Sequence, residues 1–244
     1  MYVVRYSEIG LKGKNRISFE KKLIENIKWC LDKNSIKHKI KRLRNRILIY
    51  SEQDCSCLKN IFGISSISKA VEIKADLDDI KKESLNLVFK EKSFRVSCQR
   101  LDKILKTSRE INKEVGAYIV EKKRLKVDLK NYELNIGIEL IKDKAYLFKE
   151  KIRGLDGLPV GIEGEVCVLL ENKDSLKSAY LMMKRGCSIK LTGKKINFDS
   201  LKKYSEINFV ENCEFDVVND TLDSIREGSY FRPLIGYKEK EIKV

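Results

Sequence analysis

The chain has 244 residues, of which 42% are hydrophobic, so it can bury the core of one large or two to three small domains. This composition excludes a disordered protein, and no run approaches the roughly 18 apolar residues of a membrane span. The net charge of +15, from 51 basic and 36 acidic residues, favours a polyanionic partner. Met1 leads directly into a strand-like segment without a cleavable apolar stretch, which predicts a cytoplasmic protein.

Five elements are predicted in residues 1–74. A strand over residues 1–6 precedes a helix that Asn15 opens, because apolar residues then recur at helical spacing. These are Phe19, Leu23, Ile27, Cys30 and Leu31. A strand over 39–50, a short helix over 58–61 and a strand over 66–73 follow. The alternation predicts a ferredoxin-like α+β unit.

Residues 75–158 predict a second small α/β domain. Helices are expected over 77–89 and 108–120, and strands over 93–98, 125–128, 133–141 and 144–148. Lys142 and Asp143 are expected to form the hairpin turn that joins the last two strands. Five residues then interrupt this pattern: Gly154, Gly157, Pro159, Gly161 and Gly164. We place the main domain boundary there.

Residues 159–244 predict a small parallel α/β layer. The expected order is a strand over 165–170, a helix over 175–185, strands over 189–191 and 208–210, and continued alternation over 216–227. This part contains 14 basic and 14 acidic residues, so the whole excess of positive charge falls in residues 1–158. A basic surface confined to one region favours nucleic acid as the ligand, because neutralised phosphates release counterions.

The start of the first helix has the composition of a phosphate-binding surface. Gly10 and Gly13 lie in the turn before it, and free amides and the helix dipole favour anions at such a place. The candidate RNA-binding cations here are Lys12, Lys14, Arg16, Lys21 and Lys22.

The segment from Arg5 to Glu20 resembles the start of the tRNA 4-thiouridine synthetases, the tRNA sulfurtransferases. The resemblance continues through residues 93–129, which are similar to a THUMP domain. It implies that a ferredoxin-like domain (residues 1–74) and a THUMP domain (75–158) hold the acceptor stem and 3′ end of tRNA. Further candidate cations in the matching segments are Arg95, Arg100 and Lys103.

Residues 159–244 resemble a shortened PP-loop domain whose nucleotide loop has changed. The family has the signature Ser-Gly-Gly-x-Asp-Ser, and here these positions hold Leu170, Glu171, Asn172, Lys173, Asp174 and Ser175. Glycines in such a loop let backbone amides approach phosphates, so we interpret residues 171–175 as a vestigial nucleotide loop. Asp174 could be a residual metal ligand, but Asp174 and Ser175 more simply cap the following helix.

Residues 217–222, 231–236 and 238–242 resemble the late part of the same domain. The family's Thr-Gly-Glu-type loop is replaced by Val210 to Cys213, and its sulfur-carrying cysteine lies beyond the segment that ends this chain. We therefore expect no catalytic residues, no metal site and no cofactor. The prediction is a non-catalytic tRNA-binding protein that presents tRNA to a separate modification enzyme. A sulfurtransferase whose partner supplies ATP binding or the thiol, and a general RNA-binding module, remain alternatives.

Overall fold

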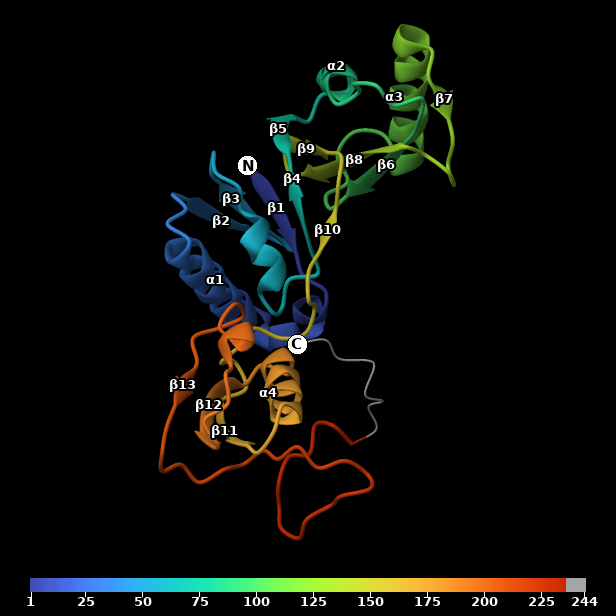
Figure 1. Cartoon of the computed structure of the whole chain (residues 1–244). Helices are drawn as coiled ribbons and strands as arrows, with labels where there is room; N and C mark the ends of the chain where they lie inside the picture. The colour runs from blue at the N-terminus through green and yellow to red at the C-terminus, as the bar shows by residue number, and fades with distance from the viewer. Residues whose placement is uncertain (236–244) are drawn as a thin grey trace. The chain divides into compact units, whose positions relative to one another are not determined.

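The first sheet has the strand order β10-β4-β1-β3-β2 (Figure 1). The computed structural model describes residues 1–235. The strands are β1 Tyr2–Arg5, β2 Lys39–Leu43, β3 Arg46–Tyr50, β4 Ser66–Lys69 and β10 Ile152–Arg153. Neighbours among β1 to β4 run antiparallel. Helix α1 (Arg16–Lys33) separates β1 from β2, and a 3-10 helix over Ser56–Asn60 separates β3 from β4, which gives the βαββαβ order of a ferredoxin-like unit.

Two predicted strands of this region were wrong in extent. Residues 39–50 form a hairpin rather than one strand, because Arg44 and Asn45 make a tight turn in which Asn45 has a φ of 66°. Residues 66–73 divide at Ala70 into β4 and β5 (Val71–Lys74), which pair in different sheets. Alternating side chains fit a continuous strand and a bent one equally well, so the pattern concealed both breaks.

The second sheet has the order β5-β9-β8-β6-β7. Its further strands are β6 Ser93–Arg100, β7 Lys126–Val127, β8 Leu134–Ile141 and β9 Lys144–Phe148, and its helices are α2 Leu77–Asn86 and α3 Ser108–Lys123. Strand β8 pairs parallel to β6 and antiparallel to β9. The predicted inward residues of α3 (Ile111, Val115 and Ile119) are buried against one apolar face of this sheet. A capping box between Thr107 and Glu110 begins α3.

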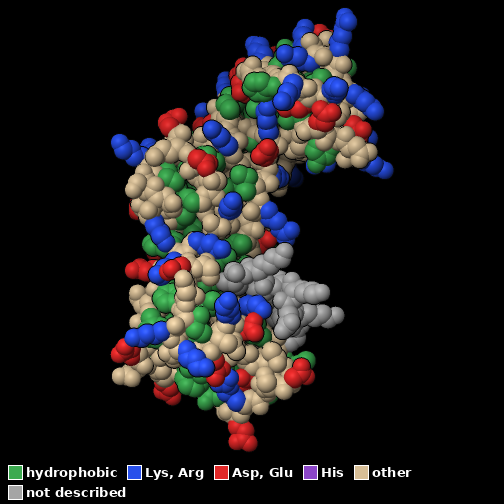
Figure 2. Space-filling model, viewed as in Figure 1, with side chains coloured by type: hydrophobic (Ala, Val, Ile, Leu, Met, Phe, Trp, Pro, Cys, Tyr) green, Lys and Arg blue, Asp and Glu red, His purple; other side chains and the backbone are tan. Residues whose placement is uncertain are grey.

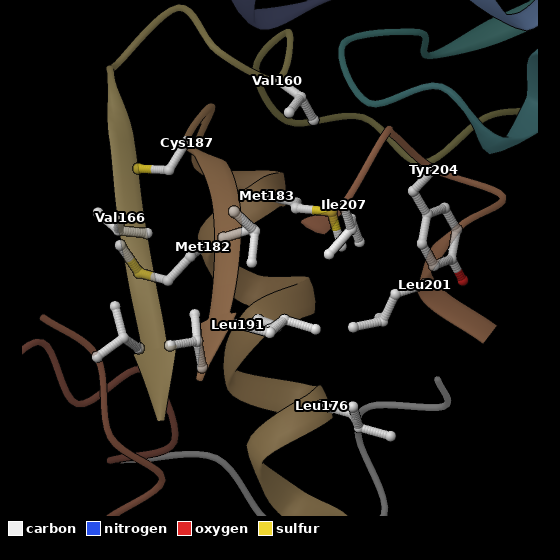
Figure 3. Close-up of a cluster of buried hydrophobic side chains, with 14 of the residues drawn as sticks. Val160, Val166, Leu176, Met182, Met183, Cys187, Leu191, Leu201, Tyr204 and Ile207 are labelled. Carbon is white, nitrogen blue, oxygen red and sulfur yellow. The ribbon is translucent and has the colours of Figure 1, made fainter. Parts of the chain in front are cut away.

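The third sheet is parallel, as predicted, with the order β11-β12-β13. Its elements are β11 Glu165–Leu170, α4 Asp174–Lys184, β12 Ser188–Gly193, the 3-10 helix Asp199–Leu201 and β13 Asn208–Phe209. Figure 3 shows Met182 and Met183 of α4 among the apolar side chains of this core, which include Val166 of β11 and Leu191 of β12. Burial of this apolar face stabilises the segment.

The strand and helix alternation expected to continue over residues 216–227 is absent from the structure of that segment. Val217 instead forms isolated bridges with Val168 and Phe231, and turns follow it. The segment is rich in Asn, Asp, Thr and Ser, whose side chains bond nearby backbone and compete with helix formation. The resembling segment 238–242, and Gly236 of the segment before it, lie outside the described residues.

Two compact units divide the described chain. The first contains Met1–Arg5, His38–Glu52 and Ser66–Ile152; the second contains Tyr6–Lys37, Gln53–Ser65 and the described residues from Arg153 onward. These units cut across the ranges 1–74, 75–158 and 159–244, and that division stays a prediction. None of the helices among residues 1–235 is long and apolar enough to cross a membrane.

Candidate functional site

The predicted N-terminal cations lie around the start of α1, in the second compact unit. The N-cap residue Asn15 makes no side-chain hydrogen bond to the first turn of α1, so the positive end of the helix dipole can attract an anion. Lys14 and Lys21 are exposed, whereas Lys22 Nζ lies 3.1 Å from Glu25 Oε2. The exposed lysines beside a helix start are suited to phosphate contacts.

Arg16 differs from the other predicted N-terminal cations because it has two internal partners. Its Nε donates to Glu20 Oε1 at 2.7 Å, and its Nη2 donates to the Tyr6 hydroxyl at 3.0 Å. The Tyr6 hydroxyl in turn donates to Glu20, and burial together with this bond raises the pKa of Tyr6 to about 12. Arg16 therefore links the first turn of α1 to Tyr6 and is less available to a ligand. Lys12 lies with its Nζ 4.8 Å from the centre of the Phe19 ring.

The other predicted cations lie in the first compact unit, on or just after β6. Arg95 Nε donates to Asn135 Oδ1 at 2.8 Å, and its guanidinium lies 4.1 Å from the centre of the Tyr132 ring. Arg100 ends β6 half-buried, and Lys103 is exposed in the following turn. Figure 2 shows many Lys and Arg side chains on the surface over α2, α3 and β7.

We expect replacement of Arg100 by Ala to weaken the tRNA binding that the resemblance implies roughly tenfold, since a hydrogen bond to a charged group contributes about 1.5–3 kcal/mol. The change in folding stability should stay below about 1 kcal/mol. Asp102 accepts a hydrogen bond from the Lys142 amide at 2.7 Å, which gives its carboxylate a partner other than Arg100. Filter binding and thermal melting of the variant measure the two effects. Unchanged tRNA affinity in the folded variant would assign Arg100 a structural role.

A buried ion cluster in the first unit was missed by the sequence interpretation. Glu139 of β8, only 1% exposed, accepts from Arg5 Nε at 2.5 Å and from Arg46 Nε at 2.6 Å. Arg5 also donates from Nη1 to Ser68 Oγ at 2.9 Å. The available signal was the single charged residue in β8, an otherwise uncharged and largely buried strand, because buried charges in proteins are normally paired.

Burial and the neighbouring charges shift the pKa values of Glu139 and Arg5 in opposite directions. Burial alone would raise the pKa of Glu139, but the hydrogen bond from Arg46 and the charges of Arg5 and Arg46 hold that pKa below its usual value. Burial lowers the pKa of Arg5, and Glu139 offsets part of this effect. The cluster therefore ties the first sheet to the second through a buried carboxylate whose charge is paired with two guanidinium groups.

The predicted vestigial loop between β11 and α4 satisfies its own backbone amides. Ser175 Oγ accepts from the amides of Glu171 at 3.0 Å and Asn172 at 3.5 Å. Asn172 Oδ1 accepts from the Asp174 amide at 2.9 Å. Lys173 precedes α4 without a side-chain cap bond, and Asp174 pairs with Lys177 Nζ at 2.7 Å rather than capping the helix. Amides bonded within the loop are less available to a phosphate.

An ion network over this loop was also missed. Arg226 donates from Nη1 and Nη2 to both carboxylate oxygens of Glu171, at 3.2 and 2.6 Å, and from Nε to Asp220 at 2.7 Å. Arg232 Nε donates to the same Asp220 at 3.1 Å. Burial would raise the pKa of Asp220, but its bonds from Arg226 and Arg232 lower it. The hollow beside the network, about 760 Å³ and lined partly by Glu171, Asp220 and Asp223, combines opposite charges rather than forming an anion cradle.

Two family models match consecutive parts of the chain. The model described as "ThiI ferredoxin-like domain" matches residues 1–68, and the model "THUMP domain" matches residues 74–150. These matches confirm the predicted order of a ferredoxin-like unit followed by a THUMP unit. The candidate cations of β6 and its following turn lie within the second matched range.

Curated relatives are similar to most of this chain. A "Probable tRNA sulfurtransferase" of Thermococcus kodakarensis is 38% identical over 202 residues, with 77% of this chain and 53% of the relative covered. One of Methanocaldococcus jannaschii is 37% identical over 222 residues, with 84% and 58% covered. The chain thus spans about half the length of the curated relatives that it matches.

Two solved structures are similar in both fold and sequence. The protein PH1313 of Pyrococcus horikoshii is 30% identical with a TM-score of 0.86, and the match covers 98% of this chain and 95% of that one. A 4-thiouridine synthetase, solved with RNA and bound ATP, is 36% identical with a TM-score of 0.66, and the match covers 79% of this chain and 52% of that one. The first match therefore includes the third sheet, which the family models leave unmatched.

Proposed function

This chain belongs to the tRNA sulfurtransferase family, the 4-thiouridine synthetases, and we propose that it binds tRNA through residues 1–158 without catalysing sulfur transfer by itself. The proposal depends on two features that occur in the same part of the chain. The ferredoxin-like and THUMP matches fall in the part of the chain that holds the whole positive charge excess. A 4-thiouridine synthetase similar to this chain has been solved with RNA, which supports an RNA ligand.

The absence of catalysis is proposed from the loop between β11 and α4. Glu171 and Asn172 stand where the family resemblance expects glycines, and their amides bond to Ser175. The carboxylate of Glu171 is directed to Arg226. Glu171 is neutralised by Arg226 and the loop amides are bonded within the loop, so neither is left to hold a phosphate, and the segment supports a structural role better than adenylation. The protein then acts as an adaptor that presents tRNA to a separate modification enzyme.

A sulfurtransferase acting with a partner is the second candidate, favoured by the name of the curated relatives. In this case another protein supplies ATP binding or the thiol. Incubating the purified chain with tRNA and radiolabelled ATP, alone and with extract of its own cell, separates the two candidates. Adenylated tRNA formed by the chain alone would contradict the adaptor role.

A general RNA-binding module is the third candidate, because phosphate contacts by themselves carry no sequence information. Competition of labelled tRNA with unrelated stem-loops of equal length and charge distinguishes it. Equal competition by the stem-loops would favour this candidate. We expect tRNA to compete at least tenfold better, since shape and single-stranded ends are what proteins recognise in RNA.

The chain should not bind ATP·Mg in the micromolar range, either alone or with tRNA. The reason is that the loop amides are bonded to Ser175 and that Glu171 and Arg226 neutralise each other beside them. Isothermal titration calorimetry measures this directly. Micromolar binding that Asp174→Ala abolishes would overturn the proposal and place the sulfurtransferase candidate first.

A further inference from the structure

One face of the second sheet carries polar side chains on β6 and β8 and the buried rings of Tyr146 and Phe148 on β9, opposite to the apolar face that packs against α2 and α3. Side chains alternate along β6 and β8, so Arg95 and Gln99 share a face with Asn135 and Glu139, which are their partners in register. The buried Arg5–Glu139–Arg46 contacts lie on this face, since Arg46 Nη2 also donates to Gln99 Oε1 at 3.2 Å. This face therefore carries the half-buried Arg95 as well as the buried Arg5 and Arg46.

The ring of Phe148 lies on the same face and contacts two of its cations. A side chain at Gly137 would collide with the Phe148 ring, so the glycine lets this ring lie flat across β8. The Arg5 guanidinium lies 4.6 Å from the ring centre, and Lys151 Nζ lies 5.7 Å from it. Arg5 and Lys151 are thus brought to one aromatic ring from opposite ends of the first unit's sequence.

The charges gathered here do not balance. Four cations, Arg5, Arg46, Arg95 and Lys151, accompany the single carboxylate of Glu139, and both its oxygens are already used by Arg5 and Arg46. Arg5 Nη2 is buried without a hydrogen-bond partner. Partial burial of the ammonium and the charge of Arg5 lower the pKa of Lys151, Glu139 offsets part of this effect, and Arg46 and Arg95 lower the pKa further. A bound anion would remove this unfavourable interaction between like charges.

We propose that Lys151 and Arg95 bind an RNA phosphate on this face, and that Arg5 and Arg46, held by Glu139, supply a fixed positive potential beneath it. The inference rests on the proposed tRNA binding and adds Lys151 to the predicted set of cations, which already contains Arg95. Lys151 is exposed, so its ammonium can reach a ligand without unfolding of the sheet. Arg95 is oriented by Asn135 and Tyr132, which fixes a second donor on the same strand pair.

The test compares Lys151→Met with Lys82→Met in tRNA titrations at several salt concentrations. Lys82 is an exposed lysine of α2 in the same compact unit, so both variants lose one surface charge. Lys151→Met should weaken binding roughly tenfold and reduce the slope of log affinity against log salt by about one, the loss of one phosphate contact. Lys82→Met should change neither quantity, and Lys151→Arg should restore most of the affinity.

Two results separate failure of this contact from failure of the proposed function. If the unmodified protein binds tRNA but Lys151→Met and Lys82→Met behave alike, the phosphate contact is wrong and tRNA binding stands. If the unmodified protein does not bind tRNA, the proposed function itself fails. Arg95→Met gives an independent second variant, which should also reduce the salt slope by about one. Thermal melting of each variant confirms that the sheet remains folded.

Discussion

Replacing Glu139 by Gln should lower the free energy of unfolding by about 3–5 kcal/mol, the effect of removing one partner from a buried ion pair. Arg5 and Arg46 would then remain buried beside each other without a counter-charge. The substitution keeps the volume of the side chain, so packing changes contribute little. Urea unfolding followed by circular dichroism measures the difference.

The matched control is Glu121→Gln, because Glu121 forms an exposed ion pair with Lys122 at 2.9 Å. An exposed pair contributes only about 0–1 kcal/mol, so this variant should unfold almost as the unmodified protein does. A loss below about 1 kcal/mol in Glu139→Gln would contradict a role of the buried carboxylate in joining the two sheets.

The effect of Glu139 on stability should depend on pH in a defined direction. Its pKa is lower in the folded chain than the usual 4.5, so its contribution is fully present above pH 4.5. The contribution is lost as the pH falls through the lower folded value, because the carboxylate must then be protonated. The stability difference between the unmodified protein and Glu139→Gln should therefore narrow below pH 4.5.

The affinity for tRNA should fall about 10³-fold between roughly 50 and 200 mM salt, if about six of the predicted cations each neutralise one phosphate. The cations near α1 and on β6 outnumber the aromatic residues beside them, so stacking on bases contributes less. Filter binding over this salt range gives the slope of log affinity against log salt.

A slope smaller than about two, equivalent to only a couple of phosphates, would contradict the electrostatic account. The control uses variants of the full chain in which Lys202 or Lys203 is replaced by an uncharged residue. Both lysines lie in residues 159–244, where basic and acidic residues are equal in number, so these variants should leave the slope of log affinity against log salt unchanged. A reduced slope in those variants would extend the RNA contact beyond residues 1–158.

The spacing of apolar residues along the sequence was sufficient to predict most of the helices and strands. The inward residues of α1 and α3, such as Leu23 and Ile111, are buried as predicted, because burial of an apolar stripe is what the helical spacing encodes. The predicted bounds of β9 and β11 agree with the structure for the same reason, since both are short apolar runs bounded by turn residues. Charge counting located the basic region without any structure.

Only the tertiary structure decided which charges face each other. Glu139 and Arg5 are separated by 134 residues, and Glu171 and Arg226 by 55, so no local pattern pairs them. The same limit applies to the break at Ala70, where neighbouring residues join different sheets. Local spacing specifies which face of an element is apolar, whereas the partner of a buried charge depends on how distant strands are brought together, and that is set by the packing of the whole core.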